Sequence, residues 1–132
     1  SSYLFYKDEL GQMKQLSSLI KKGLDSGFKA SDIVILSKKA ETKSISKNFS
    51  KELGISPFEL ERKGVSYTSI HKFKGLEAPF IILTDFDELA SEEAKKMVFT
   101  GASRATDSVH YLFNNSTKAS FLSLLMEGKG ND

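Results

Sequence analysis

The feature that most constrains this chain is IVILS at positions 33–37, a run of four apolar side chains closed by a serine. Three of the four apolar residues are β-branched. An uninterrupted apolar run of this kind is typical of a parallel strand that is buried on both faces. Such a strand needs neighbouring strands to pair with and helices to cover each face. The run therefore predicts the centre of an α/β sheet.

Strand-like and helix-like patterns alternate along the rest of the chain. Strands are expected at 3–6, 65–70, 79–86 and 109–114. Helices are expected at 10–24, 40–53, 91–105 and 117–126, mainly because apolar residues recur there at helical spacing. This alternation indicates a mainly parallel sheet with right-handed crossovers. We therefore expect one α/β domain over residues 1–127 and a frayed tail at 128–132.

Composition removes several classes of site. The chain has no cysteine and only two histidines, His71 and His110, so neither disulfides nor a metal site are expected. No apolar stretch approaches the ~20 residues that cross a membrane. The N-terminus has no signal-peptide pattern, so we expect a cytoplasmic protein without membrane contact. The net charge is only +2, so contact with a polyanion would be local.

Two polar clusters directly follow predicted strands. Lys38 and Lys39 follow the 33–37 strand, and HKFKGLE (71–77) follows the 65–70 strand. In parallel sheets ligands bind beyond the carboxyl ends of the strands, so we expect both clusters at that edge. Gly75 would let a bound group approach the backbone, and the lysines could neutralise phosphates. Taken alone, a plain strand-to-helix turn with solvated lysines explains the segment more simply.

A second cluster is MVFTGASRA at 97–105, with Arg104 near the end of a predicted helix. A cation at that position stabilises the helix dipole, so Arg104 could simply be a capping residue. The planar guanidinium also suits phosphoryl oxygens. Taken alone, the segment favours the capping role, because arginines at helix ends are frequent.

Together, the two clusters resemble motifs V and VI of the UvrD/Rep/PcrA-like superfamily I helicases. Residues 31–56 are also similar to the segment that lies between motifs IV and V in that family. The residues that carry the resemblance are His71, Lys74, Gly75, Leu76, Glu77, Gly101, Arg104 and Ala105. The chain departs from the family at Ser69 and Ser103, which replace threonines, at Lys95 and Lys96, which replace arginines, and at Phe99, which replaces a tyrosine.

The resemblance implies a RecA-like three-layer αβα fold, related to the P-loop NTPases, that serves as the second motor domain of a helicase. It implies that Arg104 is an arginine finger on the γ-phosphate, that Glu77 contacts the ribose and that Gly75 allows close approach. It also implies contacts with single-stranded DNA. The candidates for these contacts at the predicted edge are Ser69, His71, Lys38 and Lys39.

Several expected motifs are absent. The chain contains no G-x-x-x-x-G-K-[ST] loop and no suitable acidic magnesium motif, and TDFDEL (84–89) is interpreted as loop acids. ATP with Mg²⁺ would therefore be held mainly by an N-terminal RecA-like domain of the same parent chain, and this domain alone would be inactive. Motif IV and the large inserted subdomain of UvrD and Rep are also absent. The alternatives are a degenerate RecA-like module that only binds protein or nucleic acid and, less favoured, a free-standing nucleotide-binding protein.

Overall fold

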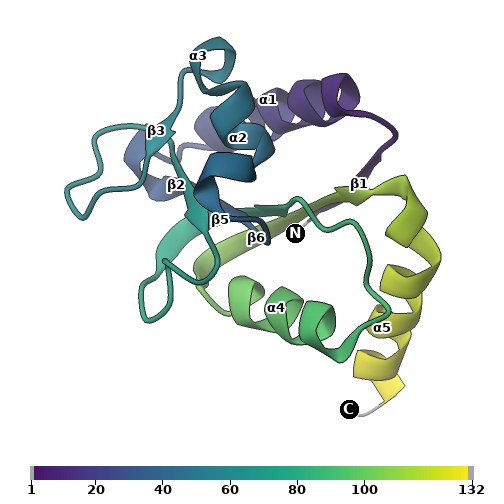
Figure 1. Ribbon diagram of the computed structural model, residues 1–132. Helices are drawn as coiled ribbons and strands as arrows, with labels where there is room; N and C mark the ends of the chain where they lie inside the picture. The colour runs from purple at the N-terminus through teal and green to yellow at the C-terminus, as the bar shows by residue number, and fades with distance from the viewer. Residues whose placement is uncertain (1, 131–132) are drawn as a thin grey trace.

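The computed structural model describes the backbone of residues 2–130 and the side chains of residues 2–127. Its centre is one six-stranded sheet in the order β1-β6-β5-β2-β4-β3, and all five strand pairs are parallel (Figure 1). The strands are β1 (Ser2–Tyr6), β2 (Ile33–Ser37), β3 (Ser56–Pro57), β4 (Ser66–Ser69), β5 (Ala78–Thr84) and β6 (Ala105–Asn114). The predicted α/β class with a parallel sheet is confirmed.

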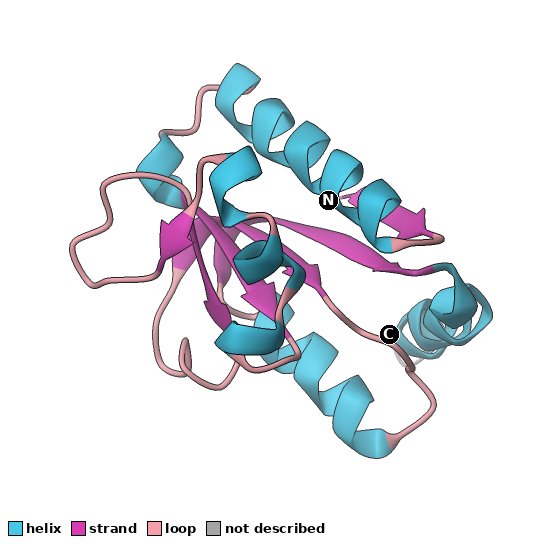
Figure 2. Cartoon of the chain, turned by 45° about the horizontal axis from the view of Figure 1, so that its top comes forward, coloured by secondary structure: helices cyan, strands magenta, loops and turns pink. Residues whose placement is uncertain are grey.

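Helices cover both faces of this sheet, which gives the predicted three layers (Figure 2). The α-helices are α1 (Glu9–Asp25), α2 (Ile45–Asn48), α3 (Ser50–Leu53), α4 (Glu92–Ala102) and α5 (Lys118–Gly130). Short 3-10 turns lie at Ala30–Asp32, Glu41–Lys43 and Asn115–Thr117. None of the helices within residues 2–130 is long and apolar enough to cross a membrane. Of the predicted frayed tail at 128–132, residues 128–130 belong to α5, and residues 131 and 132 lie outside the described residues, so the tail stays a prediction.

The central strand β2 supplies side chains to two separate cores. Ile33 and Ile35 pack with α1 and α2 on one face, whereas Val34 and Leu36 pack with α4 and α5 on the other. All of β2 is buried, as the continuous apolar run at 33–37 predicts. The sheet is therefore held from both sides, and its functional groups lie at the ends of its strands.

The predicted helix at 40–53 is wrong in its extent, because the segment is broken into short pieces. Ser44 begins α2, since its hydroxyl accepts a hydrogen bond from the Lys47 amide at 3.1 Å. Phe49, with φ −116° and ψ 22°, interrupts the helix, and Gly54 ends α3 in the left-handed conformation. The two-residue edge strand β3 was not predicted, since it is too short to show a pattern.

Three further boundaries differ from the prediction. The strand predicted over 65–70 covers only Ser66–Ser69. The helix predicted over 91–105 ends at Ala102, and β6 already begins at Ala105, so Arg104 joins a helix to a strand. The strand predicted over 79–86 ends at Thr84, because Asp85 has a positive φ of 67°. A non-glycine residue in that conformation cannot continue a strand.

Candidate nucleotide and nucleic-acid site

The predicted site residues lie at two opposite edges of the sheet. Ser69 ends β4 at the level of Ser37 on β2, which itself pairs with Thr84 at the end of β5. Ala78, which begins β5, lies six residues before Thr84, so the two edges are roughly 20 Å apart. The carboxyl edge carries Ser69, His71, Lys38 and Lys39, whereas Glu77 and Arg104 lie at the amino edge. The expectation that all of 71–77 lies at the carboxyl edge is therefore wrong.

The connection between the two edges is the crossover 70–77, a series of tight turns. The Phe73 amide donates to the Ser69 carbonyl at 3.2 Å, and the Leu76 amide donates to the Phe73 carbonyl at 3.0 Å. The Phe73 side chain is fully buried and anchors the segment in the core. Gly75 has φ +83°, a conformation that favours glycine, just before the chain enters β5. The glycine thus serves the turn that delivers Glu77 to the amino edge.

At the amino edge, the motif V and motif VI segments are joined through their backbones. The Ala78 amide donates to the Arg104 carbonyl at 3.0 Å, and Ala78 pairs with Ala105 where β5 and β6 begin. Glu77 and Arg104 each precede one of these paired alanines. The fold therefore places a carboxylate and a guanidinium on adjacent strand ends, although 27 positions separate them in the sequence.

The side chain of Arg104 has few partners. Its Nη2 donates to Ser103 Oγ at 3.2 Å, while its Nε is buried without a hydrogen-bond partner. Among the described residues no carboxylate lies within ion-pair distance of Arg104, and no hydrogen bond of its guanidinium reaches a carbonyl of α4. A helix-capping role for this guanidinium therefore has no support in the structure.

Glu77 is exposed, and its carboxylate has no hydrogen bond or ion pair to another described residue. Its backbone is held instead, because the Glu77 carbonyl accepts a hydrogen bond from Arg62 Nη1 at 3.4 Å. The carboxylate can therefore accept hydrogen bonds from a ligand without first breaking a contact within the domain.

Gly101, three positions before Arg104, is a packing residue. It is a buried residue in the last turn of α4, and a Cβ added there would overlap Leu83 Cδ2 on β5. Only glycine lets the last turn of α4 come this close to the sheet. Gly101 therefore helps to set the position of Arg104.

Arg62 is a residue of the amino edge that the sequence did not identify. It lies in the loop 58–64, where its guanidinium stands 5.3 Å from the ring centroid of Phe58. Phe58 in turn meets Phe73 edge-on, with centroids 5.1 Å apart. The loop thus braces the crossover from outside. Since these contacts depend on loop geometry, no periodicity in the sequence points to them.

Most candidate groups at the carboxyl edge are already engaged. Lys39 Nζ lies 3.2 Å from Asp87, and Lys38 Nζ lies 3.8 Å from Glu88. Ser69 is only 6% exposed, and its hydroxyl accepts the Lys72 amide at 3.1 Å. Of the four predicted DNA contacts, His71 is the one whose side chain is exposed and has no described hydrogen-bond or ion-pair partner.

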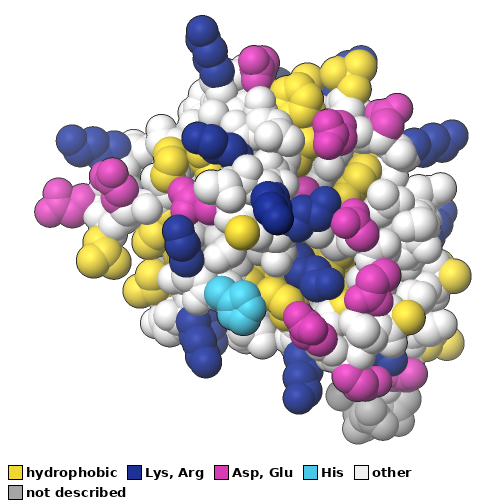
Figure 3. Space-filling view, viewed as in Figure 1, with side chains coloured by type: hydrophobic (Ala, Val, Ile, Leu, Met, Phe, Trp, Pro, Cys, Tyr) yellow, Lys and Arg dark blue, Asp and Glu magenta, His cyan; other side chains and the backbone are white. Residues whose placement is uncertain are grey.

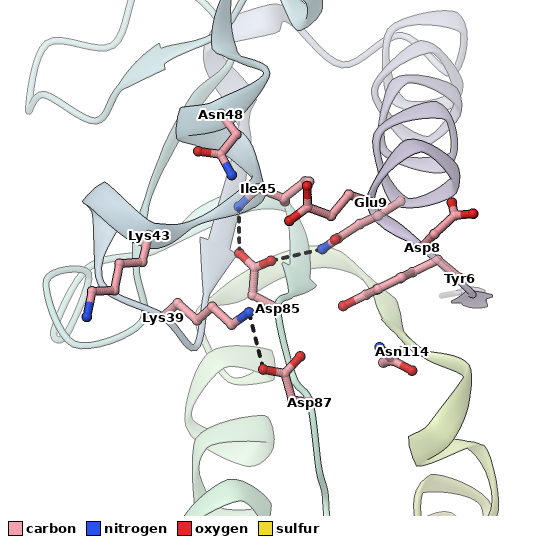
Figure 4. A pocket seen from close by; sticks show the side chains of 11 residues that line it. Tyr6, Asp8, Glu9, Lys39, Lys43, Ile45, Asn48, Asp85, Asp87 and Asn114 are labelled. Atoms are coloured by element: carbon pink, nitrogen blue, oxygen red, sulfur yellow. Dashed lines mark hydrogen bonds and ion pairs between the residues drawn. The ribbon is translucent and has the colours of Figure 1, made fainter.

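The acidic segment 84–89 is more than a set of loop acids, because Asp85 is buried. Its carboxylate accepts hydrogen bonds from Gln12 Nε2 at 2.9 Å and from the Ile45 amide at 3.2 Å (Figure 4). It also accepts one from Ser37 Oγ at 2.6 Å. Burial raises the pKa of Asp85, while these hydrogen bonds oppose that rise. Burial likewise raises the pKa of the neighbouring Tyr6. The interpretation of 84–89 as loop acids is therefore incomplete, because Asp85 lies in the loop after β5 but is buried and bonded there.

A cavity of about 170 Å³ lies beside this network at the carboxyl edge. Figure 4 shows Asp85 between α1, β2 and α2, with Lys39 bonded to Asp87 on the same side. Asp8 and Glu9 add further negative charge to the lining. Because the four carboxylates of the lining outnumber its two lysines, this cavity is not suited to a nucleoside triphosphate.

The sheet and its covering helices define an αβα domain, and the comparisons with known proteins agree with this fold. Residues 64–111 match the UvrD-like helicase C-terminal domain. This match covers β4, the crossover, β5, α4 and most of β6. The resemblance to UvrD-like helicases that the two motifs indicate is confirmed.

Among solved structures, the C-terminal domain of a possible DNA helicase from Lactobacillus plantarum WCFS1 has a similar fold, with a TM-score of 0.69. The two chains are 19% identical, and the alignment covers 89% of this chain and 74% of the other. No curated protein matches the sequence. The structural likeness extends the helicase C-terminal fold beyond residues 64–111 to most of the chain.

Proposed function

We propose that this chain is the C-terminal motor domain of an ATP-dependent superfamily I DNA helicase or translocase. It would act with an N-terminal RecA-like domain of the same parent chain. The observation that supports this best is the meeting of Glu77 and Arg104 at the amino edge, with neither side chain committed to an ion pair within the described residues. A degenerate module would have no reason to keep these two groups free and adjacent.

The amino edge fits a nucleotide that is held mainly by the other domain. The buried Nε of Arg104 lacks an acceptor, which a phosphoryl oxygen would supply. The free carboxylate of Glu77 could accept hydrogen bonds from ribose hydroxyls, and Gly75 leaves room beside it. ATP with Mg²⁺ would supply the phosphoanhydride bond whose hydrolysis drives movement along the strand.

Arg104 would act as an arginine finger in this reaction. Negative charge spreads over the γ-phosphoryl oxygens in the transition state, so a fixed guanidinium stabilises that state more than the bound ground state. The Arg104 amide donates to the Gly101 carbonyl, and the Arg104 carbonyl accepts from the Ala78 amide. These two hydrogen bonds fix the backbone position from which the guanidinium extends. Glu77 would instead contribute to nucleotide affinity, since a ribose contact is the same in both states.

The carboxyl edge would contact single-stranded DNA through Ser69, His71, Lys38 and Lys39. His71 is ready to do so, whereas the lysines must leave Asp87 and Glu88 to reach a phosphate. Binding by this domain alone would therefore be weak and would fall as salt rises. A second candidate is a degenerate RecA-like module that only binds protein or nucleic acid. The observation that favours it is that Lys38 and Lys39 are paired within the domain, as expected if this edge no longer serves a motor.

Steady-state ATPase measured beside nucleotide titration in the intact parent protein tests the proposal. Arg104→Ala should lower kcat strongly with a modest change in nucleotide affinity, and Arg104→Lys should rescue poorly because an ammonium lacks the planar fork. Glu77→Ala should mainly weaken nucleotide binding. The 132-residue chain alone should show no turnover, and robust magnesium-dependent hydrolysis by it would contradict the half-motor proposal.

A further inference from the structure

A groove lies between the crossover 70–77 and α4, with a cavity of about 210 Å³. One wall comes from the turn that carries Ile70, His71 and Lys74. The other wall comes from residues 93, 96, 97 and 100, which lie on one face of α4 because of their helical spacing. The groove thus runs from the carboxyl edge, at His71, toward the amino edge, where α4 ends.

The floor of the groove is apolar and its rim is basic. Ile70 and Met97 form the floor and are buried in the core that α4 covers. His71, Lys74 and Lys96 stand on the rim, and all three are exposed. In the part of the chain with described side chains, neither Lys74 nor Lys96 has an ion-pair partner, unlike Lys38 and Lys39. Figure 3 shows basic side chains around exposed hydrophobic ones over this part of the molecule.

We propose that this groove accepts one unstacked base of a single-stranded nucleic acid, with Lys74 and Lys96 on the flanking phosphates. An apolar cavity of ~150 Å³ accommodates benzene, so this one has room for the ring of a base. A flat apolar face and adjacent negative phosphates match the apolar floor and the two unpaired lysines. The proposal rests on the proposed function, since it extends the strand contact at His71 along α4.

The same features disfavour other occupants. An apolar side chain of a neighbouring domain would fill the floor but leave both lysines unmatched. A free anion would match the lysines but make no use of the apolar surface between them. Glu93, also on the rim, could accept a hydrogen bond from an N–H group of a base, which in thymine and uracil is the ring imide. A base with its phosphates is the ligand that uses all of these groups.

The test compares the affinity of the 132-residue chain for oligothymidylate and for an abasic oligonucleotide of the same length, at low salt. The wild-type chain should bind oligothymidylate about fivefold more tightly, the lower end of what a bound base contributes. Oligouridylate in the same assay separates a DNA strand from an RNA strand as the source of the base.

Filling the groove should remove this preference. Thr100 is exposed on the groove wall, so Thr100→Trp should block the floor without disturbing the core and bring both affinities to the abasic level. Thr100→Leu is a smaller obstruction and should have a partial effect. The matched control is Phe99→Trp, at an exposed neighbouring position that does not line the groove, and it should keep the preference.

The outcomes separate this inference from the proposed function. Equal binding of the two DNA oligonucleotides by the wild-type chain, with a loss for both in His71→Ala, would overturn the base groove but support the strand contact. An unchanged preference in a folded Thr100→Trp variant would also overturn it. No detectable binding of any oligonucleotide at low salt would overturn both the groove and the nucleic-acid part of the proposed function.

Discussion

The two edges of the sheet use their polar residues in opposite ways. At the carboxyl edge, Asp85 receives three hydrogen bonds, and Lys39 is paired with a carboxylate. At the amino edge, Glu77 and Arg104 are adjacent, and neither has an ion pair to a described residue. The carboxyl edge of a parallel sheet is the usual place for ligands. In this domain the polar groups of that edge mostly bind one another.

This difference separates groups that stabilise the domain from groups that are free to serve a ligand. A buried carboxylate with three donors holds α1, β2, β5 and α2 together, so its loss should affect folding. An exposed carboxylate or a half-buried guanidinium without an ion-pair partner contributes little to folding. The two edges should therefore respond oppositely to substitution, one in stability and the other in activity.

The largest expected effect on stability is at Asp85. Asp85→Ala removes three hydrogen bonds and leaves the Ser37 hydroxyl and the Ile45 amide buried without an acceptor, while Gln12 Nε2 keeps only its bond to Thr84 Oγ1 at 2.9 Å. The free energy of unfolding should fall by about 3–4 kcal/mol. Urea denaturation measures it, with Asp87→Ala as the control at an exposed position two residues away. A loss below ~1 kcal/mol would show that the hydrogen bonds to Asp85 do not stabilise the carboxyl edge.

A pH effect of similar size should arise inside the sheet, at His110. This histidine stacks on Phe80, with centroids 4.3 Å apart, and its ring nitrogens lie within hydrogen-bonding distance of Ser2 and Ser108. Burial lowers its pKa from 6.5 to about 4. The folded state therefore disfavours the protonated form, and its contribution is present above pH ~6.5 and lost as the pH falls toward 4.

Between pH 7 and 4.5 the free energy of unfolding should lose about 2–3 kcal/mol through His110. Denaturation curves of the wild type and His110→Gln across this range isolate that contribution, because the variant cannot titrate there. If the two proteins lose stability in parallel, the histidine is not the titrating group. The loss of stability at low pH would then have to arise from another titrating group.

Gly101 links packing to the amino edge and should give an intermediate effect. Gly101→Ala gains helix propensity but places a methyl group against Leu83, so the free energy of unfolding should fall by about 1–2 kcal/mol. Thr100→Ala, at the exposed neighbouring position, should be nearly neutral. Thermal or urea unfolding of the Gly101→Ala and Thr100→Ala variants measures the two free energies of unfolding. A gain in stability for Gly101→Ala would mean that α4 can move away from β5 at little cost.

The smallest effect on stability is expected at the amino edge itself. Glu77→Ala and Arg104→Ala should each change the free energy of unfolding by no more than ~0.5 kcal/mol, since neither side chain has an ion pair to lose. The same urea titrations as for Asp85→Ala give the comparison directly. A loss above ~1.5 kcal/mol at either position would assign it a structural role.

Much of this arrangement could be predicted from the sequence, and the failures have physical causes. The buried strand 33–37 and motifs V and VI could be predicted, because each is encoded by residues that are close together in the sequence. The separation of Glu77 from His71 is not local, because it depends on a crossover that spans the height of the sheet. Asp85 looked like a loop acid, since only the fold brings Gln12, Ser37 and the Ile45 amide to it. No sequence motif pointed to Arg62, because its contacts with Phe58 and the Glu77 carbonyl form only in the folded loop.

The chain contains two arginines, Arg62 and Arg104, and both lie at the amino edge. Each arginine is replaced by alanine in the intact parent protein, and the steady-state ATP turnover of the two variants is measured side by side. This comparison tests directly whether Arg104 is the arginine finger. Arg104→Ala should lose about 10³-fold or more, as for arginine fingers elsewhere. Arg62→Ala should retain most of its turnover, since that guanidinium only braces the loop and the Glu77 backbone. Near-normal turnover by a folded Arg104→Ala protein, or an equal loss in both variants, would contradict the assignment.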